Sequence, residues 1–320
     1  MEEASASVAL LSRSELKSFA RRSDREGLWH LAQHALLLLA TGSGVVLAGS
    51  TWWLLPAMAV HGVALTFLFA PLHETSHGTA FRSRALNEAV FRTLSVLYIS
   101  PPLVFRYWHA CHHTYTHMPG RDPDISLPLP RTLYQYLRYC SAIPFWRRNA
   151  TWFISFALGR PAPRDSWFIP REELPRAFRE ARVMLLAFGL LVALSVYLKS
   201  AAMLTLWLLP RLMGEPVMRW VRIAEHVGCE DSGDLTRNTR TTRAAPWFHW
   251  LFWNMSYHAE HHLAPATPFH ALPRLHVLVG DKLHPVGSGY GAVHAAVLRD
   301  IRSGRADYRK PTVQPMQEAA

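Results

Sequence analysis

Long apolar stretches alternate with basic, polar ones along this chain. Residues 28–73 contain no Asp, Glu, Lys or Arg, and one membrane-spanning helix needs only about 20 apolar residues. The run therefore predicts two spans, at about 28–48 and 51–72, with a turn near the glycines of residues 41–50. The alternative is a hairpin buried in a soluble core.

A second apolar pair, residues 181–199 and 201–222, predicts the third and fourth spans. The last of these is apolar only as far as Pro210, and charged residues then begin at Arg211. We therefore expect this helix to start in lipid and to continue into water. Arg211 and Glu215 are four residues apart, so they could pair on one face of the helix.

The remaining apolar stretches, residues 89–105 and 133–158, are interrupted by arginines and prolines. This pattern predicts helices at the membrane interface rather than spans. No alternation is long enough to predict a sheet. The expected fold is all-α, with four transmembrane helices in two hairpins and a helical cytoplasmic cap. We divide the chain into a tail (1–27), a membrane domain (28–280) and a second tail (281–320).

Charge adds an orientation to this picture. The formal net charge is +11, and its arginines and lysines lie in the N-terminal tail, the middle segment and the C-terminal third. The predicted hairpin tips carry Lys199 alone. This positive-inside pattern predicts a multi-pass protein with both termini and the cap in the cytoplasm, in the inner membrane if the source is bacterial. A basic surface that faces anionic lipid requires no nucleic-acid partner.

Targeting and redox signals are few. The first 20 residues lack an uninterrupted apolar core, so no cleavable signal peptide is expected. Cys111, Cys140 and Cys229 show no paired spacing, which indicates reduced thiols rather than disulfides or a cysteine zinc site.

Histidines form three clusters: "HETSH" at 73–77, "HACHH" at 109–113 and "HAEHH" at 258–262. Residues three and four apart share a helix face, so we expect each cluster to point its imidazoles one way. Each cluster follows or precedes an apolar segment on the same predicted side of the membrane. The eight candidate ligands are His73, His77, His109, His112, His113, His258, His261 and His262. Isolated histidines such as His30, His34 and His61 are expected to be structural.

The number of histidines narrows the kinds of metal site that this chain could form. "HETSH" alone matches the H-E-x-x-H motif of zinc proteases, with Glu74 as general base. A catalytic zinc takes three protein ligands, however, and eight imidazoles divide naturally between two ions. Imidazole suits iron, zinc and copper alike. At a membrane surface, such a site suits O2 chemistry on an apolar substrate. An intramembrane zinc protease and a non-catalytic metal carrier are the alternatives.

The three clusters, in this order and with two apolar hairpins between them, resemble the three-histidine-box membrane desaturases and hydroxylases. The similarity covers about residues 28–280 and includes "GRDPDI" at 120–125, residues 225–242 and residues 254–276. It is strongest to the bacterial acyl-lipid desaturase-like branch. The resemblance implies a non-haem di-iron site (Fe2+/Fe3+) with O2 as co-substrate. It also implies a ninth ligand, His226 in "RIAEH".

Carboxylates and amides near the clusters are expected to orient the imidazoles. The candidates are Glu74, Asp122, Asp124, Glu225, Glu260 and Asn238. His117 is expected to support the site or to lie at the surface, whereas His249, His270 and His276 are expected to be structural.

The resemblance also implies an electron donor. "HPVGSG" at 284–289 is similar to the His-Pro-Gly-Gly motif of a fused cytochrome b5 domain, but Val286 breaks the pattern. We therefore expect a separate ferredoxin-like or cytochrome b5-like donor with its reductase. The expected activity is desaturation of a fatty acyl chain or lipid. Hydroxylation or oxygenation of a lipid or small amphiphile is the alternative, because substrate placement decides between these outcomes.

Overall fold

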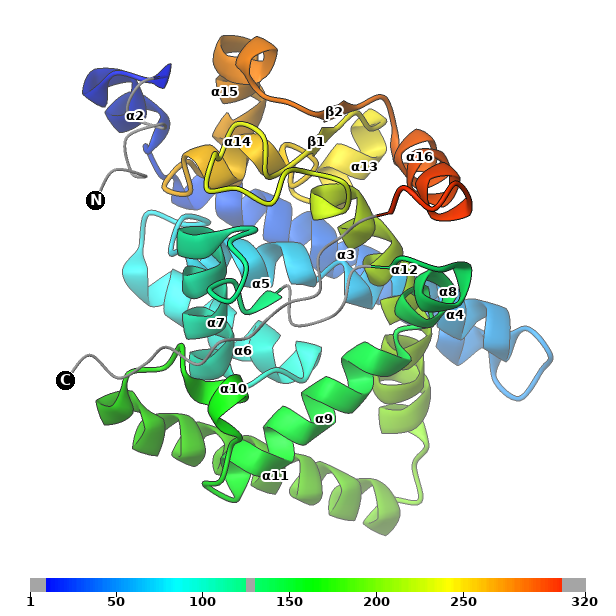
Figure 1. Ribbon diagram of the computed structural model, residues 1–320. Helices are drawn as coiled ribbons and strands as arrows, with labels where there is room; N and C mark the ends of the chain where they lie inside the picture. Colours follow the sequence, from blue (N-terminus) through cyan, green and yellow to red (C-terminus); the bar gives the residue numbers. More distant parts are fainter. Residues whose placement is uncertain (1–9, 125–129, 307–320) are drawn as a thin grey trace.

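The computed structural model describes residues 10–124 and 130–306, so the outer parts of both predicted tails, 1–9 and 307–320, lie outside it. The described part is mostly helical, as the sequence predicts (Figure 1). Its helices are α2 (Arg13–Phe19), α3 (Asp24–Ala48), α4 (Leu54–Thr66), α5 (Phe69–Ser76), α6 (Arg84–Tyr98), α7 (Pro102–Tyr115), α8 (Leu133–Cys140), α9 (Ile143–Ala157), α10 (Pro163–Ser166), α11 (Leu174–Tyr197), α12 (Leu209–His226), α13 (Pro246–Leu251), α14 (His258–Leu263), α15 (Leu272–Val279) and α16 (Tyr290–Arg302). Short 3-10 turns cover Arg171–Glu173, Phe269–Ala271 and Gly280–Lys282, and a π-helical turn covers Leu204–Leu208.

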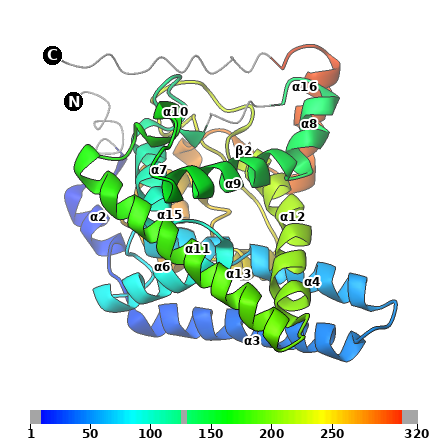
Figure 2. The ribbon, with the colours of Figure 1, turned by 90° about the horizontal axis from the view of Figure 1, so that it is seen from below.

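Three helices in the described ranges are long and apolar enough to cross a membrane. They are α3, the continuous stretch Leu54–Ser76 that joins α4 to α5, and Arg171–Tyr197, which contains α11. They correspond to the first three predicted spans. Only 22% of the apolar window of α3 and 11% of that of α11 are buried, against 61% for Leu54–Ser76. The first and third therefore lie on the outside, and Figure 2 shows α11 across the outer face of the bundle.

The turn of the first hairpin lies at the end of the expected range, residues 41–50. Gly42 and Gly44 are inside α3, which continues to Ala48. The chain reverses after Gly49, whose φ of +54° is in the left-handed region that favours glycine. Glycine content marked the neighbourhood of the turn but did not identify the residue that needs the special conformation.

The fourth predicted span, residues 201–222, is not among the three apolar helices. It forms the π-helical turn and most of α12, where Arg211, Glu215 and Arg219 interrupt the apolar sequence. These charges are buried and paired: Arg211 Nη1 and Arg219 Nε each lie 2.6 Å from a Glu215 oxygen. The predicted pairing of Arg211 with Glu215 is confirmed. The charged face of α12 is turned inward, where α4 packs against it.

The predicted interfacial stretches form α6 with α7 and α8 with α9, interrupted near the prolines as expected and at the left-handed residues Ile99 and Ala142. One smaller expectation needs correction. A minimal parallel sheet exists, in which β1 (Thr241–Thr242) pairs with β2 (Val286–Gly287). Two residues per strand leave no alternation for the sequence to display.

Candidate metal centre

Nine histidines gather into two groups whose candidate donor atoms all lie within 4.8 Å of one another in each group. Group one contains His73, His77, His109, His113 and His261, and group two contains His112, His226, His258 and His262. Seven of the nine are buried, whereas His77 and His113 are partly exposed. The structure therefore brings together all eight cluster histidines and His226.

Four helices supply these side chains. His73 and the C-cap residue His77 come from the end of α5, and His226 is the last residue of α12. The clusters on α7 and α14 are split between the groups, contrary to our expectation that each points one way. On α7, for example, His109 and His113 join group one while His112 joins group two. A helix turns about 100° per residue, so position i+4 lies about 40° to one side of position i and position i+3 lies about 60° to the other side.

The Nε2 atoms converge at separations typical of ligands that share an ion. His77 Nε2 lies 2.7 Å from His109 Nε2, which is 3.1 Å from His113 Nε2. In group two, His258 Nε2 lies 3.1 Å from His226 Nε2 and 3.2 Å from His262 Nε2. Two nitrogens each about 2.1 Å from one metal ion lie about 3 Å apart. The spacing in both groups fits a bound ion.

Two hydrogen bonds fix the tautomers in group two. Asp122 accepts from Nδ1 of His112 at 3.0 Å. The Thr116 hydroxyl donates to the His112 carbonyl, so its oxygen accepts from Nδ1 of His262 at 3.0 Å. Both rings then present an unprotonated Nε2, as metal ligands do. In group one, neither ring nitrogen of the buried His73 has a hydrogen-bond partner among the described residues, which suits a ligand role.

Burial also keeps the imidazoles neutral. It lowers the pKa of His109, His113, His258, His261 and His262 well below 6.5, and in each case neighbouring histidines lower it further. His112 differs: burial opposes its protonation, but the Asp122 carboxylate and its hydrogen bond raise the pKa. Neutral imidazole is the form that binds metal. The donor set therefore suits a borderline transition metal such as iron, zinc or copper.

Among the other candidate polar groups, only Asp122 hydrogen-bonds a cluster histidine directly. Asp124 pairs with Arg222 at 2.6 Å, and a Glu225 oxygen lies 3.7 Å from His258 Nε2. Asn238 donates to the Thr116 carbonyl at 3.0 Å and so acts on His262 through Thr116. Against the desolvation caused by burial, Arg222 and His112 hold the pKa of Asp124 below its usual range.

Glu74 and Glu260 hydrogen-bond to groups other than the cluster histidines. Glu74 is buried and its Oε1 accepts the Phe269 backbone N–H at 3.0 Å. Glu260 accepts from His276 Nδ1 and from the Thr241 hydroxyl, which ties α14 to α15 and β1. Nothing in the local sequence of Thr116 predicts its role, whereas His276 has the structural role expected of it.

The remaining histidines lie outside both groups. His30, His34 and His61 are bonded to backbone carbonyls of other segments. His117 stacks on His226 with ring centroids 5.3 Å apart, and its Nδ1 lies 3.2 Å from Asp231. It therefore supports the centre rather than lying at the surface.

An aromatic cavity of about 50 Å³ adjoins the histidines. Three of its lining residues contact the histidines: Phe69 and Phe105 contact group one, and Trp108 contacts group two. Phe69 lies 5.6 Å from His73 and Phe105 lies 5.6 Å from His109, measured between ring centroids. Trp108 stacks on His112 at 6.1 Å. The cavity is therefore one layer of aromatic rings away from both groups of donors.

Comparison with known proteins gives consistent results. The sequence model of the fatty acid desaturase family matches residues 50–294 of this chain. The chain is 26% identical over 237 residues to the sphingolipid delta(4)-desaturase/C4-monooxygenase DES2 of Rattus norvegicus, covering 72% of this chain and 67% of that protein. It is 26% identical over 274 residues to dihydrorhizobitoxine desaturase of Bradyrhizobium elkanii, covering 77% of this chain and 72% of that protein.

Proposed function

The chain belongs to the fatty acid desaturase family, and from this premise we propose that it is an O2-dependent membrane oxidoreductase whose nine clustered histidines hold two iron ions. The observation that carries the proposal is the division of the histidines into two groups of converging Nε2 atoms. Five and four imidazoles exceed the three ligands of a single catalytic zinc but suit two ions.

The protein's own residues have definite parts in this reaction. A bound iron pair would supply the activation of O2 and the removal of hydrogen from an unactivated C–H bond. Asp122 and Thr116 hold His112 and His262 in the ligating tautomer. Phe69, Phe105 and Trp108 exclude water and hold the apolar part of the substrate against the histidines.

The names of the relatives bear on the reaction. One is a desaturase and the other is both a desaturase and a C4-monooxygenase. We propose desaturation of an acyl chain or related amphiphile as the main reaction, with hydroxylation as the alternative outcome at the same site. The two differ in whether a second hydrogen is removed or a hydroxyl group is returned to the carbon.

We further propose four spans in a membrane domain of residues 28–280, with both termini and the metal centre in the cytoplasm. The inward pairing of Arg211, Glu215 and Arg219 supports a fourth span at 201–222, because these charges are hidden from lipid. Electrons would come from a separate ferredoxin-like or cytochrome b5-like protein and its reductase. The net charge of +11 favours an acidic donor, whose association would slow as salt rises.

Metal and oxygen measurements on the purified full-length protein test the proposal. We expect two iron ions per chain and O2 uptake that requires both an electron donor and a lipid or amphiphile, with an oxidised product detected by mass spectrometry. His112→Ala and His261→Ala should lose iron and turnover yet still insert in the membrane. One zinc per chain would favour the protease, and bound metal without O2 uptake would favour a carrier. Full activity of either variant would exclude the di-iron assignment.

A further inference from the structure

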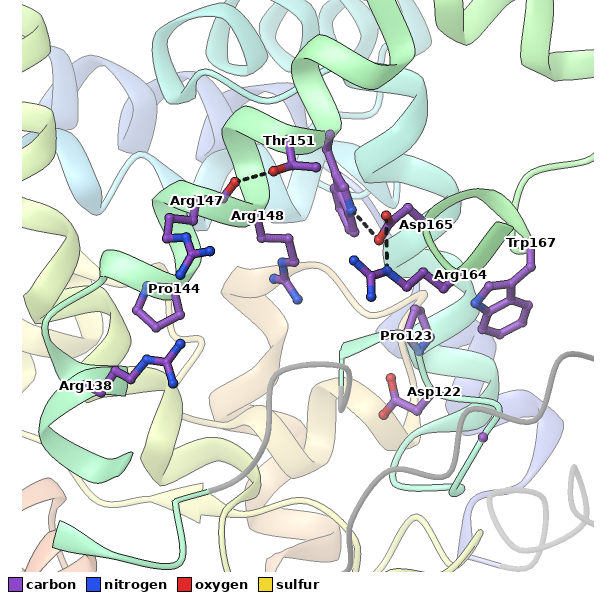
Figure 3. Close-up of a pocket in the computed structure, with 12 residues that line it drawn as sticks. Asp122, Pro123, Arg138, Pro144, Arg147, Arg148, Thr151, Arg164, Asp165 and Trp167 are labelled. Atoms are coloured by element: carbon purple, nitrogen blue, oxygen red, sulfur yellow. Dashed lines mark hydrogen bonds and ion pairs between the residues drawn. The ribbon is translucent and has the colours of Figure 1, made fainter. Parts of the chain in front are cut away.

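A second cavity, of about 450 Å³, is lined by four arginines from three helices: Arg138 of α8, Arg147 and Arg148 of α9, and Arg164 of α10. Figure 3 shows their guanidinium groups turned toward the space between them, with Trp167 at its edge. The volume is within the range of about 300–1,000 Å³ that small-molecule sites occupy.

The two acidic residues that line this cavity already have partners, and Asp165 pairs with one of the cavity's own arginines, Arg164. Asp122 accepts from His112 and from the His117 backbone N–H at 2.9 Å. Asp165 accepts the Trp152 indole N–H at 2.8 Å and lies 3.7 Å from Arg164 Nε. Within residues 10–124 and 130–306, by contrast, no ion pair is formed by Arg138 or Arg147. The cavity therefore carries an excess of positive charge that faces its interior.

The arginine-lined cavity adjoins the aromatic cavity beside the histidines. Arg148 and Trp152 line both, and Arg148 lies over the Trp152 ring at 5.1 Å. Charge is distributed unequally between the two. Two of the arginines of the aromatic cavity are paired with carboxylates, Arg219 with Glu215 and Arg222 with Asp124, each at 2.6 Å. The larger, basic cavity (the outer cavity) thus shares lining residues with the smaller, aromatic one (the inner cavity), whose rings contact the histidines.

We propose that the outer cavity binds an anionic oxyacid group of the substrate, a carboxylate or a phosphate, while an apolar part enters the inner cavity. The assignment of the apolar part as the oxidised end rests on the function proposed above. Arginine suits this role because its planar donors match both anions. The preferred substrate is therefore an anionic amphiphile rather than a neutral lipid.

Binding of simple probes tests this without any need for turnover. The full-length protein, in nanodiscs of zwitterionic lipid, would be titrated calorimetrically with hexanoate, hexyl phosphate and 1-hexanol. We expect at least one of the two anions to bind at least about ten-fold more tightly than hexanol, and the preferred anion distinguishes a carboxylate from a phosphate. Arg138→Gln and Arg147→Gln should each weaken that anion up to about five-fold, and the double variant about ten-fold or more. Arg147→Lys should lose less affinity than Arg147→Gln, because it keeps the charge but not the planar donors.

The control is Arg13→Gln, an exposed arginine on α2 that does not line the cavity. It should bind the anion as the unmodified protein does. Equal affinity for hexanol and both anions, or a double variant that binds them normally, overturns the proposal. So does a double variant that binds the anion normally but is reduced more slowly by an acidic ferredoxin, because the arginines would then be a docking surface for the donor. Anion binding without iron or O2 uptake would refute the proposed function and leave this assignment standing.

Discussion

The crossing of α4 and α12 provides a sharp test of how the fold positions the histidines. The two backbones meet at a pair of glycines. A Cβ atom on Gly214 would lie 1.9 Å from the Gly62 carbonyl oxygen, and a Cβ on Gly62 would lie 2.1 Å from the Pro210 oxygen. Small residues commonly allow such close approach between membrane helices. Gly214→Ala should therefore force the two helices apart.

The size of the effect follows from the geometry. Carbon–oxygen distances under 3.0 Å essentially do not occur, so the gap of 1.9 Å must open by about 1.1 Å. Overpacking of this kind costs about 1–3 kcal/mol and outweighs the gain of about 1 kcal/mol that Ala usually gives over Gly in a helix. The displacement also affects the metal centre, because α4 continues into α5 with His73 and His77 while α12 ends at His226. A misplacement of about 1 Å can cost about 100-fold in rate.

Thermal unfolding and metal content of the purified variants are the measurements. Gly214→Ala should lower the midpoint of unfolding by at least about 2 °C and reduce iron occupancy. The matched control is Gly189→Ala on α11, where a Cβ atom meets nothing within 4 Å. This control should keep its iron and unfold at the same or a slightly higher temperature. If the two variants behave alike in both measurements, the close crossing does not position the centre.

Three further predictions address the site and its topology. His226→Ala should cut iron occupancy or turnover by at least about 10-fold, whereas His249→Ala, which lies outside both groups, should stay close to the unmodified protein. Asp122→Asn should lower metal affinity about 10–100-fold because His112 loses its acceptor, and the exposed Asp281→Asn should not; equal affinities by competitive chelation would contradict the role of Asp122. Tags at residue 1, near Asp165 and at residue 320 should be protected in intact cells, while tags at Ser50 or Ser200 should be labelled from outside; labelling near Asp165 would refute the four-span arrangement.

Apolar runs and histidine spacing made the first three candidate spans and the gathering of the histidines predictable. Both depend on local sequence: a span needs only length and apolar content, and a helical cluster needs only its i, i+3 and i+4 positions. The fourth candidate span shows a feature that local sequence does not predict. Its i, i+4 spacing predicted the pair of Arg211 with Glu215, but not its burial. Burial depends on Thr66 of α4 and Tyr98 of α6, whose hydroxyls lie 3.3 Å and 3.2 Å from Glu215 Oε2.

The residues that hydrogen-bond to the imidazoles were less predictable, because they too depend on contacts between helices. Asp122 is ten residues from His112, and proximity in the chain was enough to suggest it. Thr116 has no such signal, because an ordinary threonine becomes an acceptor for His262 only when α7 and α14 pack together across 146 residues of sequence. Glu260 was a candidate by position, yet its partner is His276 rather than a cluster histidine. Ligand residues can be read from spacing along one helix, whereas the groups that orient them arise from contacts between helices.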